Sequence, residues 1–588
     1  MSGCGNLGTM VDKDDIIAHH AAGTLPELFV ERLRRHRTDD ISAGFRATLA
    51  ALHNEGTIDV LEPARTIGSS PVDQHDFFTV MHVYCDLIPE LNAEVPAMLA
   101  AVKALVARAG DDLASGMPNG AYRTWTEQAD RARATLAAID PEEPEDAAYV
   151  FLGLQALAKH ESDAALDAAI AYLAGTAAPA RSAAAKAIGT IELATSEARS
   201  RATDAFAAAI ATADDNSLGH ILTATCEIAR AHPEMEAAAV TLIDAAIPTV
   251  GDQAIYQVSL ELMFHGEALP PAIVAGLTTI LHKVAIGNRG TLKQIDGAGR
   301  KLVTHGRLDE ALALITPLIS EHEELTSLET LSGFSNALLH LPPDELANVI
   351  ISWLLSLDPN LGQATLSLVG DHHDDTPLVI EVDGTALGLS DADMILLAHR
   401  AIGYLFIHAI TAASLVLGLI GGATDGPREV MADILFDPLL INYSGVLADW
   451  LGERAKDSTD PTQPVIANLL ARLETYIEGL RKAGRIKELR PSERERLIEN
   501  HRQHESMRQA HKQAEKKSVF MSIVSRSVLL YGNRSISYFE GPDGSKQRNE
   551  MKLHSFSHSV EAPRLDILEP FDLDYTLRVF RAMRVAKP

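Results

Sequence analysis

Helix starts recur at nearly constant intervals between about residues 146 and 357. Each follows a short polar turn, and they fall at Asn216, Pro233, Asp252, Pro271, Thr291, Leu308, Thr326 and Pro343. Successive starts are 17 to 20 residues apart, which fits one helix of about 12–15 residues and a short turn. Two such helices make a unit of about 36–38 residues, within the range of helical-hairpin repeats. The interval predicts a mainly α fold, an α-solenoid of stacked helical hairpins.

The composition agrees with closely stacked helices. The chain has 588 residues, of which 46% are hydrophobic and 22% charged, as in a folded protein. Alanine dominates stretches such as 180–189 and 203–212, and alanine favours helix and lets neighbouring helices approach closely. A chain of this length exceeds one compact core, so several domains or one extended array are expected.

One segment resembles a known repeat. Residues 306–319, GRLDEALALITPLI, resemble the turn between the two helices of a tetratricopeptide repeat, where glycine precedes a helix that carries Glu-Ala-Leu. More broadly, the pattern is similar to HEAT-like and tetratricopeptide-like α-solenoids. That resemblance implies a curved scaffold whose surface binds other macromolecules, and it transfers no catalytic residue.

Breaks in the pattern divide the chain. The acidic, proline-rich run at 140–147 ends an N-terminal helical region, and KDSTDPTQP at 456–464 is typical of a linker. Asp383-Gly384 between alternating apolar residues predicts a small β-insert near 378–389. The expected divisions are a flexible N-terminus (1–12), an N-terminal helical region (13–145), a repeat region (146–455), a linker (456–464) and a C-terminal α+β module (465–588).

The most apolar stretch runs from Ala401 to Ala423, 23 residues without a formal charge. That length would span a membrane. Its four glycines and the polar side chains of His408, Thr411 and Ser414 favour a buried helix instead. Three scattered cysteines and the absence of a recognisable secretory signal favour a reducing, cytoplasmic location.

Charge separates the last fifth of the chain from the rest. Residues 481–588 hold 22 Lys and Arg against 14 Asp and Glu, a net charge of +8, whereas the whole chain carries −29. An acidic body repels nucleic acid and anionic membrane, so such partners are expected only at this C-terminal module. The asymmetry predicts that the module is a docking element.

The module begins with a capping box, Ser492 to Glu495, that opens a helix with almost no apolar face. Three alternatives remain for this helix: a solvated helix with i, i+3 or i+4 ion pairs, a protein-binding helix, or a nucleic-acid-binding one. The candidate partner-binding cations of the module are Arg494, Arg502, Arg508, Lys512, Lys516, Lys517, Arg578 and Arg581.

Three β-like runs follow, VLLY, RSISYFE and KQRNEMKLHSFSHSV, separated by Gly-Asn and GPDGS turns. They predict a three-strand antiparallel meander, which a helix from Phe571 to Arg584 closes. This order of helix, three strands and helix resembles that of double-stranded-RNA-binding domains. Nucleic-acid binding through 481–588 is therefore the alternative function.

Catalytic motifs are not recognisable in the sequence. The densest candidate for a metal site is His372, His373 and Asp374, but adjacent residues point in different directions and no spaced third ligand group follows. A metal-dependent enzyme is the second alternative, and no cofactor is expected. The sequence favours a non-enzymatic helical scaffold that binds a protein partner; it gives no oligomeric state.

Overall fold

The computed structural model describes residues 13–35, 39–372, 376–518, 524–530, 534–540, 544–552 and 561–584. The chain divides into two compact units, an N-terminal unit up to His340 and a C-terminal unit from Leu341. Both units are mainly helical, and most helices pack against helices that are close to them in the sequence. The mainly α fold class is therefore confirmed.

The N-terminal unit opens with helices that surround an aromatic core. They are α1 Lys13–Ala21, α2 Leu25–Arg35, α3 Asp39–Asn54, α4 Leu61–Arg65, α5 Gln74–Leu87, α6 Val95–Ala109, α7 Met117–Trp125 and α8 Ala129–Ala138. Phe29 packs edge-on against Phe45 and Tyr84, with ring centroids 6.0 and 5.6 Å apart. These buried rings supply large apolar area where alanine is less abundant.

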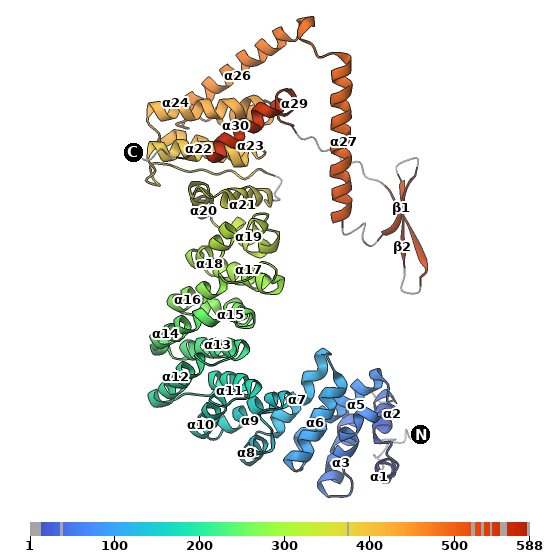
Figure 1. Ribbon diagram of the computed structural model, residues 1–588. Coiled ribbons are helices and arrows are strands. Elements are labelled where there is room, and N and C mark those ends of the chain that lie inside the picture. The colour runs from blue at the N-terminus through green and yellow to red at the C-terminus, as the bar shows by residue number, and fades with distance from the viewer. Residues whose placement is uncertain are drawn as a thin grey trace, which may run out of the picture. The chain divides into compact units, whose positions relative to one another are not determined.

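The rest of this unit forms two rows of helices. The first row contains α9 Ala147–Ala158, α11 Ala178–Thr190, α13 Asp215–Ala231, α15 Asp252–His265, α17 Arg289–Thr304 and α19 Ser332–Leu339. The second row contains α10 Ser162–Leu173, α12 Ser196–Ile210, α14 Glu236–Ala246, α16 Pro271–Leu281 and α18 Leu308–Glu321. Each helix packs against the next of its own row, and from α10 to α18 the rows lie side by side (Figure 1).

Small residues set the spacing within the first row. A Cβ added at Gly189 of α11 would lie 2.8 Å from the Cβ of Ala224 on α13. One added at Gly219 of α13 would lie 3.0 Å from the Cα of Ala254 on α15. The backbones of these helices therefore approach more closely than a larger side chain permits.

The predicted helix starts are met with one clear exception. Helices begin at Asp252, Pro271, Leu308 and Pro343, as expected. At Thr326 no α-helix begins, because the chain passes through turns and the left-handed residue Leu328 before α19 starts at Ser332. Leu328 is buried, so the turn places an apolar side chain in the core where the pattern predicts a helix.

In its described residues the C-terminal unit contains helices of more varied length and a three-stranded sheet. The helices are α20 Pro343–Leu355, α21 Pro359–Gly370, α22 Asp391–Leu405, α23 Ala409–Gly422, α24 Asp425–Ile434, α25 Val446–Arg454, α26 Gln463–Ala483, α27 Glu493–Lys517, α29 Arg564–Leu568 and α30 Pro570–Ala582. The strands are β1 Val524–Leu530, β2 Arg534–Glu540 and β3 Lys546–Lys552. They pair antiparallel in the order β1-β2-β3.

The apolar stretch from Ala401 to Ala423 is not one helix. It is divided between the end of α22 and α23, with a break at 406–408, and nearly all its side chains are buried. No helix in the described part of the chain is long and apolar enough to cross a membrane. The apolar composition of this stretch is accounted for by its burial among neighbouring helices.

The predicted β-insert near 378–389 is wrong, because this segment contains no strand. The N–H of Ile380 donates to the Ser414 hydroxyl of α23 at 2.9 Å. Asp383 accepts hydrogen bonds from the N–H groups of Thr385 and Ala386 at 2.9 and 3.3 Å, which forms a local turn. The alternating apolar residues therefore pack along a helix, and Asp383-Gly384 opens a turn without a returning strand.

Turns at 455–462 join α25 to α26 and are firmly held. Arg454 donates to Asp460 at 2.6 Å, and Asp460 also accepts from the N–H of Thr462 at 2.7 Å. Thr462 is buried. The segment predicted as a linker thus lies inside the C-terminal unit. The domain boundary expected at residue 465 also falls within this unit, which begins at Leu341.

Candidate partner-binding face

Helix α27 carries most of the cations that the sequence singles out. Arg494, Arg502, Arg508, Lys512 and Lys516 are all exposed, and the side chain of Lys517 lies outside the described part of the chain. Arg508 donates to Glu505 at 2.7 Å, and Arg502 lies 4.0 Å from Glu499. The helix holds seven Lys and Arg against five Glu, a net charge of only +2.

The two remaining candidate cations lie on α30 and are already engaged. Arg578 donates to Asp574 on its own helix at 2.8 Å. Arg581 donates to the Gly403 carbonyl of α22 at 2.6 Å, and Arg400 donates to the Arg581 carbonyl at 2.9 Å. Arg581 therefore helps to fasten the end of the chain to α22.

Further contacts hold the same C-terminal segment. The Glu561 carboxylate accepts from the N–H groups of Gly445 and Val446 at 2.8 and 2.7 Å. The Phe580 ring meets the His399 ring edge-on, with centroids 4.7 Å apart. Of the apolar face predicted for the closing helix, Leu573 is buried, whereas Leu577 and Phe580 are half-buried. Residues 561–582 thus pack on other helices of the C-terminal unit.

The metal candidates give no assembled site among the described residues. His372 Nε2 lies 3.2 Å from the Thr376 carbonyl, and His373 and Asp374 lie outside the described residues. In the described ranges no three His, Cys, Asp or Glu side chains gather as they would around a metal ion.

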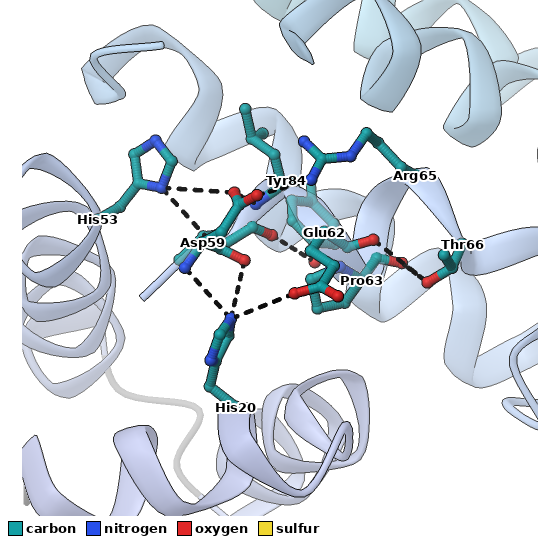
Figure 2. Close-up of polar contacts among 10 residues, drawn as sticks. His20, His53, Asp59, Glu62, Pro63, Arg65, Thr66 and Tyr84 are labelled. Atoms are coloured by element: carbon teal, nitrogen blue, oxygen red, sulfur yellow. Dashed lines mark hydrogen bonds and ion pairs between the residues drawn. The ribbon is translucent and has the colours of Figure 1, made fainter. Parts of the chain in front are cut away.

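A polar cluster near the N-terminus looks at first like a catalytic arrangement (Figure 2). Arg65 donates to Asp59 at 2.6 Å, His20 Nε2 lies 3.1 Å from the Asp59 carbonyl, and Tyr84 donates to the Val60 carbonyl at 3.1 Å. Burial would raise the pKa of Asp59, but Arg65 and the Leu61 N–H together hold it below its ordinary value. Because these bonds fasten the loop before α4, the cluster is structural.

The exposed face of the first row contains two adjoining cavities. The first, named here the Asn119 cavity, has a volume of about 490 Å³ and lies over α9 and α11. The second, the Glu261 cavity, has a volume of about 210 Å³ and lies over α11, α13 and α15. Lys186 and His220 line both cavities, so the two form one continuous face.

The Asn119 cavity combines an apolar floor with polar groups. The Lys186 ammonium lies 4.7 Å from the centre of the Phe151 ring. Asn216 donates to the Ser182 hydroxyl at 2.9 Å. Asn119 Oδ1 is buried at the cavity and has no hydrogen-bond partner among the residues that the structure describes. An acceptor in that position is ready for a donor from outside.

The Glu261 cavity is lined by a buried carboxylate. Glu261 is 8% exposed, and within the described ranges its Oε1 has no hydrogen-bond partner. Burial, with a contribution from Glu227, raises the pKa of Glu261 to about 7, although Arg230 opposes the shift. Burial also lowers the pKa of His220 and of His265, so both imidazoles favour the neutral form. Burial in this cavity therefore favours the neutral forms of Glu261, His220 and His265.

This face has no recognisable signature in the sequence. Its residues come from helices that span residues 119–265, and they match no short motif. One signal was present, since Glu261 lies between Val258 and Leu262 on the apolar side of its helix. A carboxylate in a core position needs a partner or a function.

Comparisons with known protein families, with curated proteins and with solved structures found no match to this chain.

Proposed function

We propose that this chain is a non-enzymatic α-helical repeat scaffold, of HEAT-like or tetratricopeptide-like type, that binds a protein partner along the face of α9, α11, α13 and α15. The observation that carries the proposal is the pair of adjoining cavities on that face. Each contains a buried acceptor, Asn119 Oδ1 or Glu261 Oε1, to which no described residue donates a hydrogen bond.

Energetics support a binding role for these two atoms. A buried acceptor without a donor costs about 1–3 kcal/mol of stability. The cost is removed when a partner supplies N–H groups, so both acceptors favour the bound state over the free one. Peptide segments carry N–H donors along their whole length, and stacked helical repeats offer extended surfaces for them.

The C-terminal unit adds a second element to the proposal. Helix α27 is exposed along nearly its whole described length, whereas α30 is packed on α22. We assign the docking role expected of the basic module to α27. Its net charge of +2 and its local ion pairs favour a protein partner over a phosphate backbone, which proteins usually neutralise with several unpaired cations.

A steric change on the face tests the proposal. Thr223 lies on α13 and lines the Glu261 cavity. Thr223→Arg fills that cavity. As a control, Thr241→Arg places the same side chain at an exposed position of α14 in the second row. Tagged full-length chains are purified from the native host, and partners are identified by mass spectrometry and mapped by cross-linking.

We expect a partner that cross-links to α11, α13 or α15, is retained by Thr241→Arg and is lost with Thr223→Arg. Recovery of no partner, or of one that is insensitive to Thr223→Arg, overturns the proposed face. Partner loss on addition of nuclease would instead favour the nucleic-acid alternative.

A further inference from the structure

The Glu261 cavity has a volume that suits one long side chain. Its volume is about 210 Å³, less than half that of the adjoining Asn119 cavity. Carboxylates of Glu227 and Glu261 line it, with Leu260 and Ala224 as apolar wall. Phe264 adds an aromatic ring that is 52% exposed.

Charge in this cavity is incompletely compensated. Arg230 is the nearest cation to both carboxylates, at 3.9 Å from Glu227 and 4.0 Å from Glu261. Both distances exceed that of a hydrogen bond. Two carboxylates therefore share one guanidinium that bonds neither of them closely, and the buried Glu261 Oε1 remains without a donor.

The neighbouring cations do not fill the cavity. The Lys186 ammonium is engaged over the Phe151 ring on the side of the Asn119 cavity. Lys301 of α17 donates to the Phe264 carbonyl at 3.2 Å. His220 and His265 favour the neutral form because burial lowers their pKa values. A further cation can therefore enter without displacing an existing close ion pair.

We propose that the Glu261 cavity binds an arginine side chain carried by an extended segment of the partner protein. The inference rests on the proposed function and specifies what the partner presents. The guanidinium donates to Glu261 Oε1 and to Glu227, its plane stacks on the exposed Phe264 ring, and its methylene groups contact Leu260 and Ala224. Lysine has no planar group and makes fewer of these contacts.

Binding of such a cation is linked to protonation of Glu261. The charged groups that face Glu261 are Glu227 and Arg230, and Lys186, His220 and His265 complete the titratable lining of the cavity. With a pKa of about 7, Glu261 is partly protonated at neutral pH in the free chain. Because the guanidinium favours the carboxylate, affinity rises as pH increases from 6 to 8.

The test uses single side chains as probes of the full-length chain. N-acetyl-arginine amide, N-acetyl-lysine amide and N-acetyl-citrulline amide are titrated against it, with binding followed by saturation-transfer NMR at pH 6 and pH 8. Citrulline keeps the shape of arginine without its charge. The variants are Glu261→Gln, Phe264→Ala at the exposed ring, and the control Asp244→Asn on exposed α14.

We expect the arginine probe to bind most tightly and the citrulline probe to bind about tenfold more weakly. Glu261→Gln lowers affinity for arginine about tenfold, Phe264→Ala about threefold, and Asp244→Asn leaves it unchanged. Because Phe264 is half-exposed, its truncation keeps the test independent of any folding defect in Glu261→Gln.

Equal binding of citrulline and arginine, equal or tighter binding of lysine, or unchanged affinity in Glu261→Gln overturns the arginine assignment. Failure of the arginine probe, with a partner still lost in Thr223→Arg, overturns this inference alone and leaves the scaffold function standing. Failure of both experiments overturns the scaffold face as well.

Discussion

The face of the first row and helix α27 carry charge in opposite ways. Along the described part of α27 most Lys, Arg and Glu side chains are exposed, and some pair locally, as Arg508 does with Glu505. On the first row one carboxylate, Glu261, is buried without a hydrogen-bond donor for its Oε1. Exposed ion pairs contribute little free energy, whereas a buried unpaired group costs much more. The number of charges therefore locates a binding site less well than their burial does.

The first row also differs in packing from α26, the helix that precedes α27. The helices α11, α13 and α15 are held together by small side chains at close contact, as at Gly189 and Gly219. Gly479 of α26, in contrast, has open space where its Cβ would lie. A site on the first row is thus built on a stiff support, which favours a preorganised cavity.

The largest effect is expected where the first row packs most closely. Gly189→Leu forces α11 and α13 apart, because its Cβ alone would lie 2.8 Å from the Cβ of Ala224. The free energy of unfolding of the N-terminal unit should fall by about 3 kcal/mol. Differential scanning calorimetry checks this. Gly479→Leu, at an open position, should leave stability equal or higher, and equal losses in both variants would refute the packing difference.

Next in size is the pH dependence that Glu261 creates. Its pKa is raised from 4.5 to about 7, mainly by burial. Between these values the folded chain binds more protons than the unfolded chain, so stability is lost as pH rises through the window. Glu261→Gln lacks this loss. Its free energy of unfolding, relative to that of wild type, should therefore increase by about 2 kcal/mol from pH 5 to pH 8.

Denaturant unfolding at both pH values measures that difference. Asp244→Asn, at an exposed position of the second row, should follow wild type at each pH. A difference between Glu261→Gln and wild type that does not change with pH would show that Glu261 ionises normally in the folded chain.

A smaller effect should distinguish substitution of Arg581 from substitution of Arg578, which lies on the same helix, α30. Arg581→Gln removes the bond to Gly403 and the contact with the Tyr404 ring, whose centre lies 5.5 Å from the guanidinium. Opening of α30 should become easier by about 1 kcal/mol, seen as faster hydrogen exchange over 570–582. Arg578→Gln, which removes only an exposed pair, should not change the exchange. Equal effects would mean that α30 is not fastened through Arg581.

The smallest effect is expected on α27. Glu505→Ala removes the carboxylate that Arg508 bonds at 2.7 Å, but both groups are exposed and alanine favours helix. Thermal unfolding should show no measurable change. A clear loss of stability would mean that α27 makes contacts beyond its own turns, and its charges would then not be the weakly coupled surface groups inferred here.

Local signals in the sequence were sufficient for much of the fold. Proline, aspartate and leucine after polar turns marked the starts at Asp252, Pro271, Leu308 and Pro343, because the rules for helix ends are local. The left-handed turn at Leu328, a buried non-glycine residue, has no local signal in the sequence. The segment near Asp383 does not form the predicted hairpin, because Ile380 bonds Ser414 of the distant helix α23. The Glu261 cavity joins three helices, and only the hydropathy of a single helix hinted at it.

The fastening of α30 to α22 has a consequence for synthesis of the chain. Arg581 and Gly403 are 178 residues apart. At about 5–20 residues per second, a ribosome needs roughly 10–35 s to pass from one to the other. Throughout that time α22 has emerged without the helix that covers it, including the His399 ring against which Phe580 packs. The C-terminal unit therefore completes its core only after α30 has been synthesised, and a chain that stops before α30 would present this uncovered surface to the quality-control machinery of the cell.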